Sequence, residues 1–230
     1  TPAVDPELRI NWNAVQETWR IVGYARKDRS VFLAVIGISW FWFFGSVMTL
    51  QIPAYTLDIL NGNEEVTTIL LVAFAVGVGI GALLCERLSG HRIELGLVPL
   101  GSLGLTIVAI DLYFAQTTKH PLVVTTLGEL LARPGSIRVL VDLALLGAFG
   151  GLYSVPLYAM IQERANRQHL SRIIAANNII NSLFIVSAAG MALTLLNAGL
   201  TIPELFLALA CLNGVVAARI FIGVPEFAQR

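Results

Sequence analysis

The stretch VTTILLVAFAVGVGIGALLC, residues 66–85, decides the fold of this chain because none of its residues is charged. An α-helix rises about 1.5 Å per residue, so a helix over this stretch matches the ~30 Å hydrocarbon core of a membrane. Backbone polar groups cannot be left without partners in lipid, and a helix pairs them within one segment. The sequence therefore predicts a transmembrane helix over 66–85.

Five further stretches share this length and apolar character: 31–54, 95–115, 138–161, 173–195 and 203–223. Of the 230 residues in the chain, 56% are hydrophobic and only 13% are charged, whereas a soluble domain averages about 25% charged residues. We predict an all-α membrane protein whose six transmembrane helices form a bundle over 31–223, followed by a cytoplasmic tail over 224–230.

The basic residues alternate between the two sides of this predicted topology. Only three of the 15 Lys and Arg residues, namely Lys119, Arg133 and Arg138, fall at one side. The other twelve fall at the chain ends and in the alternate connections, as the positive-inside rule requires for six spans with both ends in the cytoplasm. We expect a multi-pass protein of a bacterial inner (plasma) membrane.

Two segments outside the spans carry patterns of their own. In the segment 1–30, a predicted cytoplasmic connector, Trp12, Val15 and Trp19 recur at helical spacing. This fits an amphipathic helix at the inner interface, and a short solvated linker is the alternative. The apolar patch 122–131 in the longest outer connection is too short to span, and it fits a surface helix, a lid or an ordered loop.

Sequence signals for catalysis are absent. The chain contains no nucleotide-binding loop, metal-ligand cluster or nucleophile–base arrangement, so we expect no catalytic residue, no metal and no cofactor. A net charge of zero gives no field that would attract nucleic acid. His91, His120 and His169 lie in connections, and Cys85 and Cys211 lie at or in apolar segments, where packing is their expected role.

Residues 77–92, GVGIGALLCERLSGHR, combine a small-residue helix face with a charged turn. Gly77 and Gly81 are four residues apart, so a neighbouring helix can approach closely. The turn that follows could latch two helix ends together and release them, or it could serve only to set the topology. The candidate gating residues are Glu86, Arg87, Gly90, Arg92 and Glu94.

Polar residues inside the predicted spans are costly in lipid, which makes them candidates for substrate contact. The candidate substrate-binding residues are Gln51, Asp142, Tyr153, Asn177 and Asn181. Asn177 and Asn181 share a helix face, and interhelical hydrogen bonding is the alternative for them. Packing is the alternative for Gln51, and an interfacial position is the alternative for Asp142 and for Asp111.

The stretch GAFGGLYSVP, residues 147–156, weakens the fourth predicted helix in mid-membrane. It supplies the candidate hinge residues Gly147, Gly150, Gly151 and Pro156, and a passive kink for packing is the alternative. The aromatic run 40–44 covers all faces of the first predicted helix. Some of it must therefore meet lipid, and part of it could line a path for an acyl chain.

These motifs resemble two levels of one family. The turn in 77–92 resembles the loop signature of the major facilitator superfamily, with Glu86 in place of the usual Asp and one extra residue between Arg87 and Gly90. Three longer strings are similar to its lysophospholipid transporter branch: GISWFWFFG (37–45), LSGHRIELGLVPLGSLGLTIVAIDLY (88–113) and GLYSVPLYAMIQ (151–162). In many relatives that transporter is fused to a glycerophospholipid acyltransferase.

The resemblance runs along essentially the whole chain and implies the C-terminal six-helix half of such a transporter. It implies flipping of a lysophospholipid across the membrane, with membrane lipids, an N-terminal six-helix half and a fused or associated acyltransferase as partners. We expect this chain itself to transport by alternating access and not to be an enzyme. The alternatives are a multidrug or other small-molecule efflux facilitator, the membrane part of a phospholipid acyltransferase, and a receptor that transports nothing.

Overall fold

The computed structural model describes residues 14–90, 94–115 and 126–223, which form eight α-helices and no strand. Six of the helices are long and apolar enough to cross a membrane. They are α2 (Arg29–Asp58), α3 (Glu64–Ser89), α4 (Leu97–Phe114), α6 (Ser136–Arg164), α7 (Leu170–Asn197) and α8 (Ile202–Gly223). The predicted fold class of six transmembrane helices is thereby confirmed.

Polar caps fix where two of the spans begin and end. The Asp28 side chain precedes α2 and accepts hydrogen bonds from the backbone N–H groups of its first turn. Asn63 caps α3 in the same way. These contacts satisfy donors that a helix start leaves without partners. Gly90 ends α3 with φ 55°, in the left-handed conformation that glycine adopts without a Cβ clash.

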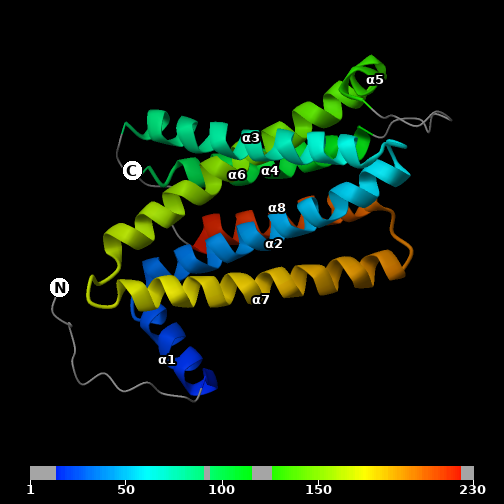
Figure 1. The fold of residues 1–230 in the computed structure, drawn as a ribbon. Coiled ribbons are helices and arrows are strands. Elements are labelled where there is room, and N and C mark those ends of the chain that lie inside the picture. Colours follow the sequence, from blue (N-terminus) through cyan, green and yellow to red (C-terminus); the bar gives the residue numbers. More distant parts are fainter. Residues whose placement is uncertain (1–13, 91–93, 116–125, 224–230) are drawn as a thin grey trace.

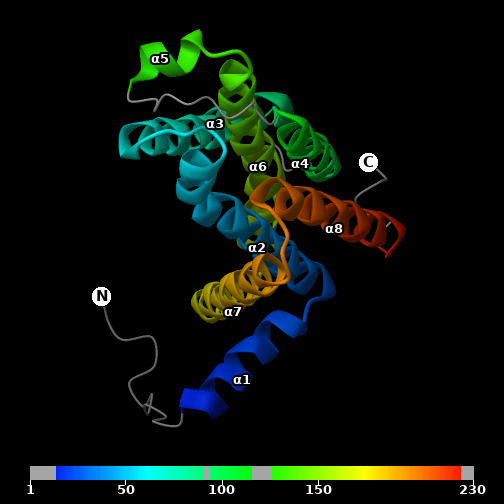
Figure 2. The same cartoon turned by 90° about the vertical axis from the view of Figure 1, so that its right-hand side faces the viewer.

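The spans surround two central helices (Figures 1 and 2). In the most apolar 18-residue segments, 56% of α2 and 61% of α6 is buried, against 22% in both α3 and α7. Packing explains the difference: α6 lies against α3 and α4, whereas α2 lies against α7 and α6. The helices α3 and α7 therefore form the edges of one side of the bundle, with α2 and α6 between them (Figure 2).

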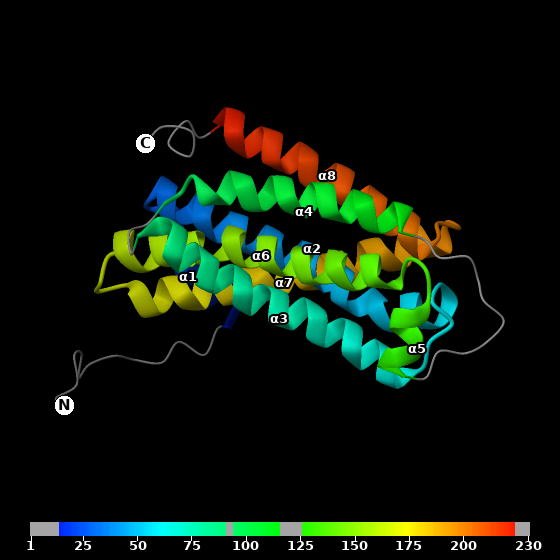
Figure 3. The same cartoon turned by 90° about the horizontal axis from the view of Figure 1, so that it is seen from above.

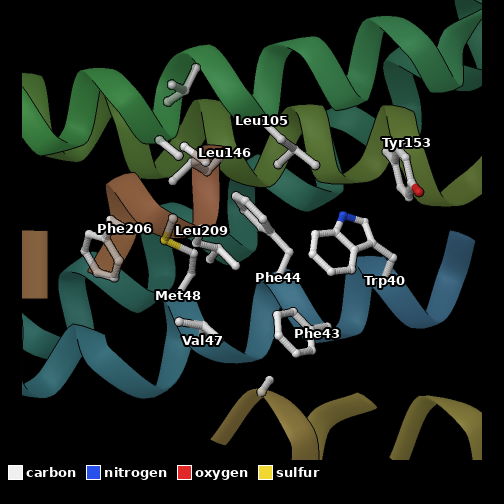
Figure 4. Packing of buried hydrophobic residues seen from close by; sticks show 14 of the residues in the cluster. Trp40, Phe43, Phe44, Val47, Met48, Leu105, Leu146, Tyr153, Phe206 and Leu209 are labelled. Atoms are coloured by element: carbon white, nitrogen blue, oxygen red, sulfur yellow. The ribbon is translucent and has the colours of Figure 1, made fainter. Parts of the chain in front are cut away.

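Aromatic and aliphatic side chains fill the space between these helices (Figure 4). Trp40, Phe43 and Phe44 of α2 are buried, with Phe44 pointing towards Leu105 of α4 (Figure 4). Their neighbour Trp42 is 41% exposed. The aromatic run 40–44 thus divides between core and surface, because five consecutive residues of a helix point in all directions around its axis.

The closest helix pair is α3 with α6, which cross in the view of Figure 3. A Cβ added to Gly77 would lie 2.0 Å from the Ala144 carbonyl oxygen, and one added to Gly147 would lie 2.1 Å from the Phe74 carbonyl oxygen. Real Cβ atoms essentially never come within 3.0 Å of another atom. The absence of side chains at both positions therefore sets how near these two helices lie.

Two short helices, α1 and α5, lie outside the spans at opposite ends of the bundle (Figure 1), and the two ends are named after them. Helix α1 (Ala14–Arg26) packs on α7 and α2. A helix is therefore present in the segment 1–30, and its position at the inner membrane interface stays a prediction. Helix α5 (Leu127–Ala132) begins after the Thr126 cap and buries Leu130. The α1 end corresponds to the predicted cytoplasmic side and the α5 end to the predicted outer side.

Candidate functional site

The five predicted substrate-binding residues do not form one cluster. Tyr153 is 2% exposed, and its hydroxyl donates a hydrogen bond to the Gly37 carbonyl of α2 at 3.2 Å. The Asn181 side chain is buried and its Oδ1 accepts from the Ser39 hydroxyl at 2.7 Å. Both groups join α2 to a neighbouring helix, which is the alternative that the sequence had left open for Asn181.

The other three candidates differ in what surrounds them. Asn177 shares the buried face of α7 with Asn181, as predicted from their spacing, but its Oδ1 has no hydrogen-bond partner among the described residues. Asp142 is buried near the α5 end of α6. Gln51 is half-buried on α2. A direct role in substrate binding stays a prediction for all five.

A buried polar network connects α2, α4 and α8, and the sequence did not predict it. The Trp40 indole N–H donates to Asn213 Oδ1 at 2.7 Å. Asn213 Nδ2 in turn donates to the Ser102 carbonyl at 3.0 Å and to the Thr106 hydroxyl at 2.8 Å. These contacts join residues more than 100 positions apart, so spacing along the chain gives no signal for the partners.

One polar pair faces the open side of the bundle, between the edges formed by α3 and α7. The Trp42 indole N–H of α2 donates to the Tyr158 hydroxyl of α6 at 3.0 Å, and the pair is exposed. Along the same helix, Ser46 and Thr49 are half-buried, and their hydroxyls donate to carbonyls of α2 itself. On α7, Asn178 is exposed.

The faces of the other spans are apolar by contrast. The large hydrophobic side chains that α3 and α4 expose are Leu71, Val72, Val76, Ile80, Leu83, Leu84, Leu88, Leu100, Leu103, Ile107 and Phe114. Aliphatic surface of this extent suits contact with lipid chains. The side of α2, α6 and α7 is therefore the one on which neutral polar groups are open.

Three charged residues of the spans lie together at the α5 end. Arg138 of α6 and Asp111 of α4 form a two-point ion pair, with Arg138 Nε 3.0 Å from Asp111 Oδ2. Asp142 lies one turn further along α6 and interacts with both. From the sequence, Arg138 was considered only as one of the basic residues that set the topology. The Asp111–Arg138 pairing could have been predicted, because Asp111 lies near the end of the third predicted span and Arg138 at the start of the fourth, on the same side of the membrane.

The predicted gating residues lie at the α1 end of α3. Glu86 and Arg87 are exposed in its last turn, and Gly90 has the left-handed geometry described above. Glu94 is exposed before α4. Arg92 lies outside the described residues. The tight turn at Gly90 is present, whereas the latch function remains a prediction.

The predicted hinge residues all lie inside one continuous helix, α6, which contains Pro156. Gly147 and Gly151 contact the backbone of α3, and Gly150 faces the Phe41 ring of α2. These contacts correspond to the packing alternative. Bending at these positions is an untested prediction.

A bundle of six apolar helices with a neutral polar side is typical of membrane transport proteins. The chain belongs to the Major Facilitator Superfamily, because the model of that family matches residues 2–189. Members of this superfamily are secondary transporters, so the protein belongs to that functional class. No curated protein matches the chain. No solved structure matches it either.

Proposed function

We propose that this protein is the six-helix half of a transporter that moves an amphiphilic lipid, such as a lysophospholipid, across the inner membrane by alternating access. The observation that carries the proposal is the open polar pair Trp42–Tyr158, set among half-buried hydroxyls on the side of the bundle between α3 and α7. A second six-helix half would cover this side, and the substrate would pass between the halves.

The hydrogen bonds on this side determine what each group can offer to a substrate. The Tyr158 oxygen accepts from Trp42, which leaves the phenolic O–H to donate to a phosphate oxygen. Ser46 and Thr49 already donate their hydrogens to α2, so they offer acceptor lone pairs to a cation. A donor for phosphate and acceptors for an ammonium group suit a zwitterionic headgroup.

The apolar surroundings support a substrate with a chain. Phe41 lies next to the polar pair, and its ring contacts the Trp42 ring with 6.1 Å between the centroids. The charged groups described in the spans lie near the ends of the bundle. A sugar or a dianion would need more polar or basic groups in mid-membrane than this side provides. The similarity of three sequence strings to lysophospholipid transporters supports the same substrate class.

Uptake by vesicles containing the purified full-length protein tests the proposal. We expect transport of fluorescent lysophosphatidylethanolamine to fall about tenfold or more in Tyr158→Phe, because a hydrogen bond to a charged group contributes about 1.5–3 kcal/mol. The matched control is Leu103→Ala, since Leu103 is 57% exposed on the apolar face of α4. This control should leave transport unchanged.

The same vesicles separate the alternatives. Export of a hydrophobic cationic dye without lysolipid transport would refute the lipid substrate and support an efflux facilitator. Acyl transfer by this chain alone would refute the expectation that it is not an enzyme. If the transported lipid is acylated when an acyltransferase is added to the vesicles, and not when that enzyme is left out, the result would support the proposed fused or associated partner.

A further inference from the structure

Basic side chains gather around one tyrosine at the α1 end of the bundle. The ring of Tyr24, on α1, packs on the His169 ring at the start of α7, with 4.5 Å between the centroids. The Arg172 guanidinium of α7 lies 5.1 Å from the Tyr24 ring centroid and donates a hydrogen bond to the Tyr24 hydroxyl at 2.8 Å. The Lys27 ammonium lies 5.0 Å from the same centroid. One ring therefore brings together two positive charges from distant parts of the sequence.

Neither of these two cations forms an ion pair with a carboxylate in the described parts of the chain. Asp28 follows Lys27 directly, but its carboxylate accepts hydrogen bonds from the first turn of α2. Arg26 adds a third positive charge next to Lys27, with its guanidinium 5.5 Å from the Phe32 ring centroid. The segment 164–172 contains three arginines and no acidic residue. Like charges held this close repel one another, and an anion bound among them would remove the repulsion.

The start of α7 favours an anion in the same place. Its N-cap residue, His169, makes no side-chain capping hydrogen bond, and the first turn of this fully described helix contains no acidic residue. The first N–H groups of a helix have no partner within the helix, and they carry the positive end of its dipole. Since Arg172 is the third residue of α7, these N–H groups add to the positive potential beside it.

The length of the spans places the cluster at the depth of lipid headgroups. Helix α7 contains 28 residues and α2 contains 30, so each is about 42–45 Å long at 1.5 Å per residue. A bilayer is about 40–45 Å thick when its headgroup regions are included. The first turns of α2 and α7 therefore lie among the phosphate groups of one leaflet, and the cations around Tyr24 lie there with them.

Helix α1 has the features of a helix that lies in this headgroup layer. It leaves the bundle beside the first turns of α7 and runs obliquely to the spans (Figures 1 and 2). The Trp19 side chain is 66% exposed, and Arg26 follows seven residues later on the same face of the helix. Tryptophan is enriched where lipid chains meet water, and basic side chains at this level reach the phosphates.

We propose that the basic cluster around Tyr24 binds the headgroup phosphate of an anionic diacyl phospholipid in the leaflet at the α1 end. The cations are Arg26, Lys27 and Arg172, and Trp19 lies beside the glycerol and acyl groups. Tyr24 is a positioning residue, because its ring and hydroxyl hold the side chain of α7 next to that of the turn after α1. The proposed substrate path suits a zwitterionic headgroup and shares none of these residues.

Native mass spectrometry of the purified full-length protein measures lipid binding when phosphatidylglycerol or phosphatidylcholine is added in detergent. We expect the wild type to prefer phosphatidylglycerol. Arg26→Gln/Lys27→Gln should weaken this binding about 25-fold, since each basic residue near a lipid surface contributes a factor of about five. This double variant keeps the hydrogen bond between Arg172 and Tyr24 that joins α7 to α1.

Two controls match the double variant. Arg26→Lys/Lys27→Arg keeps both charges and should bind phosphatidylglycerol as the wild type does. Arg219→Gln removes an exposed arginine near the end of α8, a helix that has no close packing with α1, and it should also bind as the wild type does. Monodisperse elution and an unchanged helical circular dichroism spectrum show that each variant is folded.

Three results would overturn the proposal. The first is equal binding of phosphatidylglycerol by the wild type and by folded Arg26→Gln/Lys27→Gln. The second is displacement of phosphatidylglycerol by an equal concentration of glycerol 3-phosphate, which would indicate a site for a soluble anion. The third is equal affinity of the wild type for both lipids, which would leave the cations for an acidic segment of a protein partner. Because neither lysolipid nor transport is measured, a positive result stands even if the protein does not move lysophospholipid.

Discussion

Replacing Gly77 by alanine tests the close contact between α3 and α6. The new Cβ would lie 2.0 Å from the Ala144 carbonyl oxygen, a backbone atom that cannot rotate away. The helices must separate by about 1 Å to reach the shortest contact that real Cβ atoms show, and a gap of that size forfeits about a quarter to a half of the dispersion energy across the interface. We expect a loss of about 1–3 kcal/mol in the free energy of unfolding.

Gly79 provides the control on the same helix. It is exposed, and a Cβ added there meets nothing within 4 Å. Alanine favours a helix over glycine by about 0.5–1 kcal/mol, so Gly79→Ala should be neutral or slightly stabilising. The pair differs only in which face of α3 carries the new methyl group.

Denaturant titration in detergent micelles, followed by circular dichroism, measures the difference. Gly77→Ala should unfold at a lower denaturant concentration than the wild type, and Gly79→Ala should not. The double variant Gly77→Ala/Gly81→Ala should cost less than the sum of its parts, because one separation of the helices relieves both clashes. Equal midpoints for the Gly77 and Gly79 variants would refute the reasoning.

Three further predictions concern other contacts of the bundle. Tyr24→Ala should release α1 and speed amide hydrogen exchange across 14–26. Tyr24→Phe should have a smaller effect, because it keeps the ring 5.1 Å from the Arg172 guanidinium and loses only the hydrogen bond that Arg172 donates to the Tyr24 hydroxyl at 2.8 Å. Asn213→Leu should lower the unfolding free energy by about 1–3 kcal/mol, since the buried indole N–H next to it loses its acceptor; an unchanged denaturation midpoint would contradict this. Gly90→Ala should cost about 1–2 kcal/mol at φ 55°, measured by the same titration, and no loss would show that the turn relaxes.

The six spans could be predicted from the sequence because burial in lipid depends on the length and composition of a segment. An uncharged run such as 66–85 must be helical whatever it packs against. The same argument does not tell which side of each helix faces a neighbour. Trp40 and Trp42 have equal hydropathy, yet one is 9% exposed in the core and the other is 41% exposed on the open side. Only the packing of α2 against α4, α6 and α8 separates them.

The candidate site was harder to predict for the same reason. A polar residue in a span must find a partner, but the sequence does not say whether that partner is a substrate or a neighbouring helix. Tyr153 and Asn181 were predicted to bind substrate; both bond to α2 in the structure, and their role in binding stays a prediction. Tyr158, on which the proposed function rests, was not among the predicted substrate-binding residues.

The polar contacts between helices lead to a view of how the bundle would move. Ser39–Asn181 ties α2 to α7, Asn213 ties α8 to α2 and α4, and the glycine contacts fix α3 against α6. If α6 bent at Gly147, either α3 would have to move with it or the close backbone contacts between α6 and α3 at this glycine would break. Rotation of the whole bundle against the proposed second half would break none of these contacts. The structure therefore favours movement of this half as one body, with the open side of α2, α6 and α7 as the surface whose neighbours change.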